Sequence, residues 1–159
     1  MKVTILCVGK IKEKFFSDAI DEYIKRLGRY CKPEIIQVPD EKDPGECSDK
    51  VVTAVKDKEG EKLLKHLLPD ALKIALCIDG KKMSSEKFAA RINETGLTGV
   101  SHIQFVIGGS LGLSDNVINA CDEKLSFSDM TFPHQLMRVI LLEQIYRAYR
   151  IISGEPYHK

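Results

Sequence analysis

The chain has no tryptophan, almost no net charge and no long apolar run. A formal net charge of +1 at pH 7 excludes nucleic-acid binding through overall charge, so any such partner must meet a local basic patch. No stretch approaches the ~18 apolar residues that a membrane span needs. The apolar start, Val3–Val8, meets Gly9 and then charged residues, which indicates a strand rather than a signal peptide. We therefore expect a cytoplasmic protein without a membrane partner.

The five cysteines show no spacing that suggests a metal site or a disulfide framework. They are odd in number and scattered, without a C-x-x-C pair or a Cys/His pattern. Cys7 and Cys77 lie inside apolar runs, where cysteine packs as a small hydrophobic residue. These features predict reduced thiols and no bound metal.

Strands and helices alternate along the chain. With 159 residues, 43% of them apolar, one domain spanning 1–159 is the natural expectation. Short apolar runs predict strands at Val3–Val8, Glu34–Val38, Leu72–Ile78, Ile103–Ile107 and Lys124–Phe127. Helical periodicity and caps predict helices over about 13–30, 48–68, 86–94, 114–121 and 134–152. This order predicts an α/β fold, with a mostly parallel sheet and helices on both faces.

The last predicted helix, residues 134–152, is apolar over most of its circumference. A helix buried this broadly needs two packing surfaces. Its own sheet supplies one, and a second subunit is the simplest source of the other. The sequence therefore predicts a homodimer.

A glycine-rich loop, Gly108–Gly112, follows the fourth predicted strand and reads G-G-S-L-G. It lacks the G-x-G-x-x-G order of a dinucleotide-binding loop, although Asp129 lies at about the distance of the ribose-binding acid. It does fit G-x-S-x-G, with Ser110 as nucleophile and His134 or His158 as base. The chain order Ser110, Asp129, His is also that of an α/β serine hydrolase, with Asp129 as the acid. The chain is short for that fold, and a simple tight turn fits the glycines as well.

A second loop, Phe127–Phe132, follows the last predicted strand. It carries no lysine or arginine for phosphates, but its backbone groups can contact the edge of a nucleobase between the apolar side chains of Met130 and Phe132. Loops after parallel strands are where α/β proteins bind ligands. Together the two loops favour a neutral or cationic adenosine-type ligand over a nucleoside triphosphate.

Basic side chains gather late in the chain, while the mixed charges of residues 56–62 predict a solvent-exposed helix face. The late group comprises His134, Arg138, Arg147, Arg150, His158 and Lys159, against Glu143 and Glu155. One interpretation is a local patch that contacts RNA phosphates. The other is an ordinary Glu143–Arg147 helix pair followed by a frayed tail, and the spacing alone favours neither.

The chain also resembles one family from end to end. The segments that carry this resemblance are Val8–Lys10, Lys58–Gly60, Phe105–Gly109, Gly112–Leu113, Leu125–Ser126, Met130–His134, Arg138, Glu143–Gln144, Tyr146–Ala148 and Pro156–His158. They are similar to the ribosomal large subunit methyltransferase H family, which N3-methylates a pseudouridine in a stem-loop of 23S rRNA. The resemblance implies a SPOUT-class fold with a C-terminal trefoil knot, a homodimer, and S-adenosylmethionine as cofactor.

The resemblance further implies a role for particular residues. The implied cofactor contacts are Leu76, Gly108, Phe127, Ser128, Asp129, Met130, Thr131 and Phe132. His158 is the implied base or proton relay, with Tyr157 and Arg147 as orienting residues in a site shared between subunits. Arg138 and Lys159 are candidate contacts to RNA phosphates. The expected substrate is 23S rRNA within the large subunit or the 70S ribosome; a Ser110 hydrolase and a non-enzymatic RNA-binding protein remain alternatives.

Overall fold

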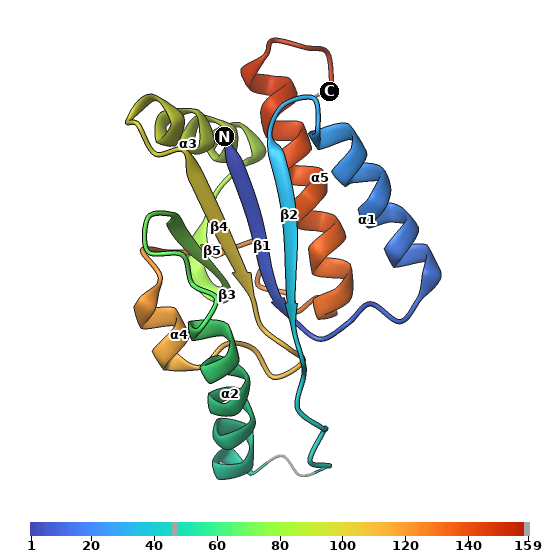
Figure 1. The fold of residues 1–159 in the computed structure, drawn as a ribbon, viewed down its shortest axis with the longest axis vertical. Coiled ribbons are helices and arrows are strands. Elements are labelled where there is room, and N and C mark those ends of the chain that lie inside the picture. Colours follow the sequence, from blue (N-terminus) through green and yellow to red (C-terminus); the bar gives the residue numbers. More distant parts are fainter. Residues whose placement is uncertain (46–47, 158–159) are drawn as a thin grey trace.

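The structure, a computed structural model, describes residues 1–45 and 48–157 (Figure 1). Strands and helices alternate along the described chain, as predicted. In order they are β1 (Lys2–Val8), α1 (Lys14–Leu27), β2 (Lys32–Val38), α2 (Asp49–Leu64), β3 (Leu72–Lys82), α3 (Ser85–Leu97), β4 (His102–Ile107), α4 (Asp115–Ala120), β5 (Glu123–Ser126) and α5 (His134–Ile152). Within the described ranges, no helix is both long and apolar enough to cross a bilayer.

The strands form one parallel sheet in the order β2-β1-β4-β3-β5. In the centre, Ile5 of β1 aligns with Ile35 of β2 on one side and with Phe105 of β4 on the other. Each connection between parallel strands must cross back over the sheet, and here α1 to α4 provide those crossings. The predicted α/β fold with a parallel sheet is therefore confirmed.

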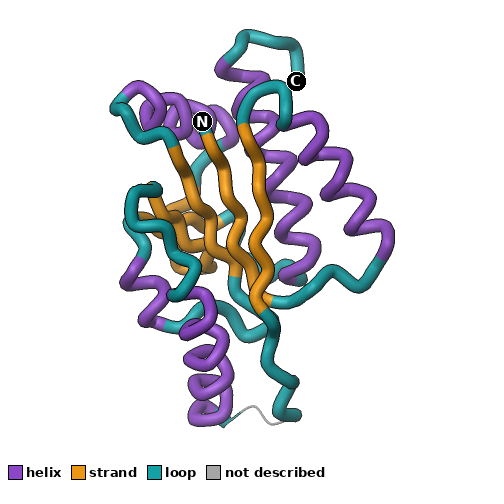
Figure 2. Tube along the Cα trace, viewed as in Figure 1, coloured by secondary structure: helices purple, strands orange, loops and turns teal. Residues whose placement is uncertain are grey.

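Helices cover both faces of this sheet, which Figure 2 shows as a layer of strands between helices. On one face α1, α3 and α5 pack over a cluster that includes Ile5 and Phe105. On the other face α2 and α4 cover a smaller cluster that includes Leu6 and Val106. Neighbouring residues of one strand thus pack into the two different clusters, because successive side chains of a strand point to opposite faces of the sheet. This explains why the strands are continuous apolar runs.

The largest difference from the predicted elements is in β3, which continues past its predicted turn to Lys82. The strand is irregular between Leu76 and Lys81, and both of these residues align with Leu125 of β5. Gly80 makes the close approach possible, because a Cβ there would lie 2.5 Å from the carbonyl carbon of Leu125. The predicted turn is therefore a bulge that β5 holds in place.

Helix α5 has its predicted bounds, His134–Ile152, and lies beside α1 along the sheet (Figure 1). Its inner side is fully buried and consists of Arg138, Leu141, Leu142, Ile145 and Ala148. The opposite side, which includes Leu136, Ile140 and Arg147, is only partly buried. One side of an otherwise apolar helix is therefore left without a complete packing partner.

Candidate functional site

A cavity of about 900 Å³ opens at the carboxyl ends of β4 and β5, beside the irregular part of β3. Its wall comes mainly from three segments: 76–79 in the irregular part of β3, 107–113 at the end of β4, and 125–134 at the end of β5. Ligands of α/β proteins bind at this edge of the sheet, and the volume lies within the usual range for small-molecule sites. The two loops singled out in the sequence therefore meet at one cavity.

The residues predicted to bind a cofactor surround this cavity, with one exception. Those that line it are Leu76, Gly108, Phe127, Ser128, Met130, Thr131 and Phe132. Asp129 instead points to solvent and forms an ion pair with Lys82 of β3. The Asp129 carboxylate thus links the loop Phe127–Phe132 to β3 on its solvent side, while the neighbouring residues of the loop line the cavity.

Packing within the protein explains the glycines that follow β4. A Cβ on Gly108 would lie 2.5 Å from the carbonyl carbon of Gly112, and a Cβ on Gly109 would lie 2.8 Å from Oε2 of Glu59. Gly112 itself has a φ of +89°, and its N–H donates to the carbonyl oxygen of Gly109 at 3.1 Å. Gly108 remains a predicted cofactor contact, but these approaches show that the loop also needs its glycines to fold back on itself and to pack against α2.

Glu59 is a buried acid behind this loop, and sequence reasoning missed it. Only 5% of the residue is exposed; Oε1 accepts a hydrogen bond from the Glu41 N–H at 3.0 Å, and Oε2 has no partner among the described residues. Burial raises the pKa of this carboxyl group. Glu59 belongs to α2. The mixed charges of residues 56–62 had predicted a solvent-exposed helix face, which is wrong for Glu59 and Gly60. The only available signal was their place in a segment that carries the family resemblance.

The hydrolase alternative gains no support from the geometry. Ser110 is exposed at the cavity, and in the described part of the chain no hydrogen bond joins it to His134. The acid in the proposed order, Asp129, is paired with Lys82. Nucleophilic serine chemistry needs the base bonded to the serine and oriented by the acid. The other candidate base, His158, lies outside the described residues.

Arg138 was predicted to contact RNA phosphates, and this prediction is wrong for the conformation described. The side chain is fully buried, and its Nη2 donates hydrogen bonds to the carbonyl oxygens of Val8 at 2.5 Å and Gly9 at 2.9 Å. Burial lowers the pKa of this guanidinium. Arg138 therefore ties the first turns of α5 to the end of β1 and presents no surface to RNA.

Arg147 and Tyr157 lie together near the end of α5, around Glu143. The Tyr157 ring lies over the Arg147 guanidinium, 4.9 Å from its centre. Oε1 of Glu143 accepts hydrogen bonds from Nε and Nη2 of Arg147 at 3.0 and 2.7 Å, and from the Tyr157 hydroxyl at 3.4 Å. The predicted Glu143–Arg147 pair is thus confirmed, and Glu143 is a third polar member that we had not assigned to a site. His158 and Lys159 lie outside the described residues.

These residues do not reach the large cavity of their own chain. Met137 lines that cavity and Arg147 lies ten residues further along α5, an axial rise of about 15 Å. The end of α5 lies at the opposite end of the molecule from the tip of β4, which borders the cavity (Figure 1). Within one chain, the predicted cofactor and catalytic residues form two separate groups.

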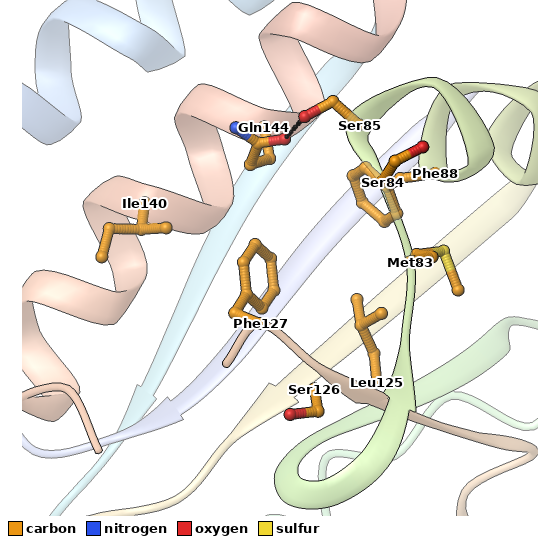
Figure 3. Close-up of a pocket in the computed structure, with 9 residues that line it drawn as sticks. All are labelled: Met83, Ser84, Ser85, Phe88, Leu125, Ser126, Phe127, Ile140 and Gln144. Carbon is orange, nitrogen blue, oxygen red and sulfur yellow. Dashed lines mark hydrogen bonds between the residues drawn. The ribbon is translucent and has the colours of Figure 1, made fainter. Parts of the chain in front are cut away.

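A smaller cavity of about 290 Å³ lies beside the first, between α3 and α5 (Figure 3). The two cavities share Leu125, Ser126 and Phe127 as wall residues. Across the smaller one, the Ser85 hydroxyl of α3 donates to Oε1 of Gln144 of α5 at 2.7 Å. Of the residues predicted to have a role, it contains only Phe127.

The cysteines described in the structure are free thiols. Burial raises the pKa of the Cys7 and Cys31 thiols to about 11, which leaves them protonated at neutral pH. Over 1–45 and 48–157, no group of three or more His, Cys, Asp or Glu side chains is arranged to hold a metal ion.

Comparison with known proteins identifies relatives along the whole chain. The family model described as "Predicted SPOUT methyltransferase" matches residues 1–158. The chain is 61% identical to Ribosomal RNA large subunit methyltransferase H of Bifidobacterium adolescentis and 59% identical to the protein of that name from Clostridium novyi (strain NT), each over 100% of both chains. Among solved structures, a probable methyltransferase from Bordetella pertussis Tohama I aligns with a TM-score of 0.60 and 15% identity, over 92% of this chain and 93% of that one. This last similarity concerns the fold.

Proposed function

The chain belongs to the SPOUT methyltransferase family, and from this premise we propose that it N3-methylates a pseudouridine in a stem-loop of 23S rRNA with S-adenosylmethionine as methyl donor. The names of its full-length relatives support the coarser part, methylation of large-subunit rRNA. The observation that carries the proposal is the cavity at the ends of β4 and β5, which is walled by the loops that the family resemblance assigns to the cofactor.

The lining of this cavity suits a sulfonium cofactor. Its acidic and basic side chains are Asp79, Asp115 and Lys56, with His134 at the far end. Two acids against one lysine favour a cationic ligand, whereas a triphosphate would need several cations. S-adenosylmethionine would be held by Leu76, Gly108 and the loop Phe127–Phe132, whose backbone groups can pair with adenine. When bound, it supplies an already activated methyl group.

We propose that two copies of the chain complete one active site. The outer side of α5 is partly exposed and includes the apolar residues Leu136 and Ile140, as expected of a helix that packs on a second copy. If two α5 helices cross antiparallel about a two-fold axis, the end of each helix lies over the start of the other. Arg147 and Tyr157 of one chain would then approach the cavity of its partner.

The residues of this composite site have defined tasks. Methyl transfer to N3 requires the methyl group and the ring nitrogen in line, and loss of the N3 proton. The Arg147 guanidinium, oriented by Glu143, would stabilise negative charge on the ring. Tyr157, packed on Arg147, would orient the tail that carries His158 as proton acceptor. Lys159 remains a proposed phosphate contact; as Lys it gives a single charge rather than a bidentate fork.

The substrate we propose is 23S rRNA in the assembled large subunit or the 70S ribosome, in the cytoplasm. A net charge of +1 offers little general attraction to free RNA, so the shape of a dimer must contribute to selection. The same proposal includes a trefoil knot in the C-terminal part, as family membership implies. It also includes a single domain over 1–159, because all strands join one sheet.

Removal of Tyr157–Lys159 tests the composite site. The truncated chain should still bind S-adenosylmethionine with a normal Kd, because the cavity and its loops are intact. It should lose methylation of 70S ribosomes, because the polar groups of the tail are gone. Isothermal titration measures the first property, tritiated methyl transfer the second, and light scattering the mass. Tyr157→Phe is the matched control, since it keeps the ring over Arg147. Full turnover by the truncated chain would contradict the proposal.

A further inference from the structure

The small cavity between α3 and α5 has no role in the proposed cofactor site. We propose that it binds the acceptor base itself, a pyrimidine-type ring turned out of the RNA, with the Gln144 carboxamide reading the edge of that ring. This inference rests on the proposed function, because it requires an RNA base as acceptor. It assigns the substrate side of the site to residues from α3, β5 and α5.

The position of the cavity is the first argument. It shares Leu125, Ser126 and Phe127 with the large cavity, so a ring in one cavity and a cofactor in the other would lie on either side of the end of β5. Group transfer needs the reacting atoms within about 3–3.5 Å of one another. A neighbouring cavity that shares a wall is therefore where the acceptor belongs.

The size and lining are the second argument. At about 290 Å³ the cavity is much smaller than the cofactor cavity of about 900 Å³. Two aromatic rings contribute to it, Phe88 and Phe127, whose centres lie 6.5 Å apart in an edge-to-face arrangement. None of its lining residues carries a charge. A flat, neutral heteroaromatic ring fits such a lining, whereas a phosphate does not.

The polar groups at the cavity are the third argument. Ser85 and Gln144 point toward one another across it (Figure 3), with the Ser85 hydroxyl donating to Oε1 of Gln144 at 2.7 Å. The other end of the carboxamide is fixed, because Nε2 donates to Oε2 of Glu143 at 2.6 Å. While Nε2 stays bonded to Glu143, Oε1 of Gln144 can accept a hydrogen bond from the edge of a base in place of the one from Ser85. Proteins recognise unstacked bases by such hydrogen bonds and by stacking.

Glu143 links this cavity to the predicted catalytic residues. Its Oε2 accepts from Gln144, and its Oε1 accepts from Arg147 and Tyr157. Occupation of the small cavity would therefore be transmitted through one carboxylate to Arg147 of the same chain, which in the proposed dimer serves the cavity of the partner. The base must first leave its stack, which restricts the substrate to a loop or an unpaired nucleotide.

Three variants separate base reading from a structural role. Gln144→Leu removes the carboxamide at similar volume; Ser85→Ala removes the same bond between the helices but keeps the carboxamide. Gln135→Leu is the control on the same helix, because Gln135 lines neither cavity. We expect kcat/KM for ribosomes to fall about tenfold or more in Gln144→Leu, the loss of roughly one hydrogen bond. Ser85→Ala should stay within about threefold of wild type. Cofactor Kd should be unchanged in both, and Tm should fall by no more than a few degrees in either, because both lose the bond between α3 and α5.

Two outcomes would overturn the inference while leaving the proposed function intact. One is normal kcat/KM for ribosomes in Gln144→Leu. The other is an equal loss in Gln144→Leu and Ser85→Ala, because that pattern indicates only a structural bond between α3 and α5.

A direct probe keeps the inference testable even if the chain does not methylate rRNA. Uridine, titrated into protein saturated with S-adenosylhomocysteine, should shift the NMR signal of the Gln144 side-chain amide. Ribose should not shift it, and Gln144→Leu should lose the response at Phe127. If uridine shifts none of the signals of the cavity up to its solubility limit, the assignment of the cavity is wrong.

Discussion

Replacing Arg138 by methionine tests the structural role that separates this residue from an RNA contact. Methionine has a similar length but cannot donate to the carbonyl oxygens of Val8 and Gly9. Two hydrogen bonds from a charged donor are together worth about 3–6 kcal/mol. Nε and Nη1 of Arg138 have no partner in the described part of the structure, and removing these buried donors returns about 1–3 kcal/mol. The net loss should centre on about 2–3 kcal/mol.

For a domain of this size, that loss corresponds to a decrease in Tm of about 4–12 °C. Thermal and urea unfolding followed by circular dichroism measure it directly. Arg26→Met is the matched control: Arg26 forms an exposed i,i+4 pair with Glu22, and such pairs contribute about 0.5 kcal/mol or less. Ribosome affinity of folded Arg138→Met should stay close to that of wild type. A variant with unchanged stability and much weaker ribosome binding would refute the reasoning and restore the phosphate contact.

Three further predictions concern the cavity loop and the core. Gly108→Ala should lower Tm and abolish cofactor binding in calorimetry, because its Cβ would lie 2.5 Å from the carbonyl carbon of Gly112; normal affinity would contradict this packing. In Glu59→Gln, the free energy of unfolding relative to wild type should rise with pH. The raised pKa means that the folded state holds the carboxyl proton more tightly, so wild type loses stability as pH rises from the unfolded toward the folded pKa; a pH-independent difference in urea unfolding would argue against it. Cys7 and Cys31 should react with a thiol reagent at neutral pH only after unfolding, because burial raises their pKa to about 11; rapid reaction of native protein would show that they are accessible.

Local features of the fold were predictable because they depend on neighbouring residues. Apolar runs and helical periods gave the alternation of elements, and α5 begins and ends where its pattern does. Ser84 and Ser114 cap α3 and α4, each accepting a hydrogen bond from a backbone N–H three residues later. Ser48 stands at the predicted start of α2, although its side chain forms no cap bond.

Features that depend on distant residues were not predictable in this way. The carbonyl groups that Arg138 binds lie about 130 residues earlier in the sequence, so a late basic residue looked like part of a surface patch. Glu59 looked solvent-exposed because the residues next to it in the sequence are charged, whereas Gly109, which lies against it, belongs to the loop that follows β4. The bulge in β3 depends on β5, which pairs with β3 only after the chain has crossed the sheet twice more. The pattern of side chains along the sequence indicates how a residue relates to its sequence neighbours. The contacts of Arg138, Glu59 and β3 depend instead on which distant segments the fold brings together.

The candidate site shows the same division. Five of the residues that line the large cavity come from the loop Phe127–Phe132, which the sequence had singled out. That loop follows a strand and has no lysine or arginine for phosphates, and both features can be read from the local sequence. The separation of Arg147 and Tyr157 from that cavity is visible only in three dimensions. That separation is what makes a second copy of the chain necessary in the proposed mechanism.

The most direct test is to locate the methyl group that the protein transfers. Purified protein, S-adenosylmethionine and 70S ribosomes from cells that lack this activity should be incubated together, with free 23S rRNA in parallel. Nuclease digestion and mass spectrometry of the RNA then identify the modified nucleoside. We predict one methyl group on N3 of a pseudouridine in 23S rRNA, with ribosomes preferred over free RNA. Methylation of another base or of ribosomal protein, or no transfer by protein that binds the cofactor, would contradict the proposed function.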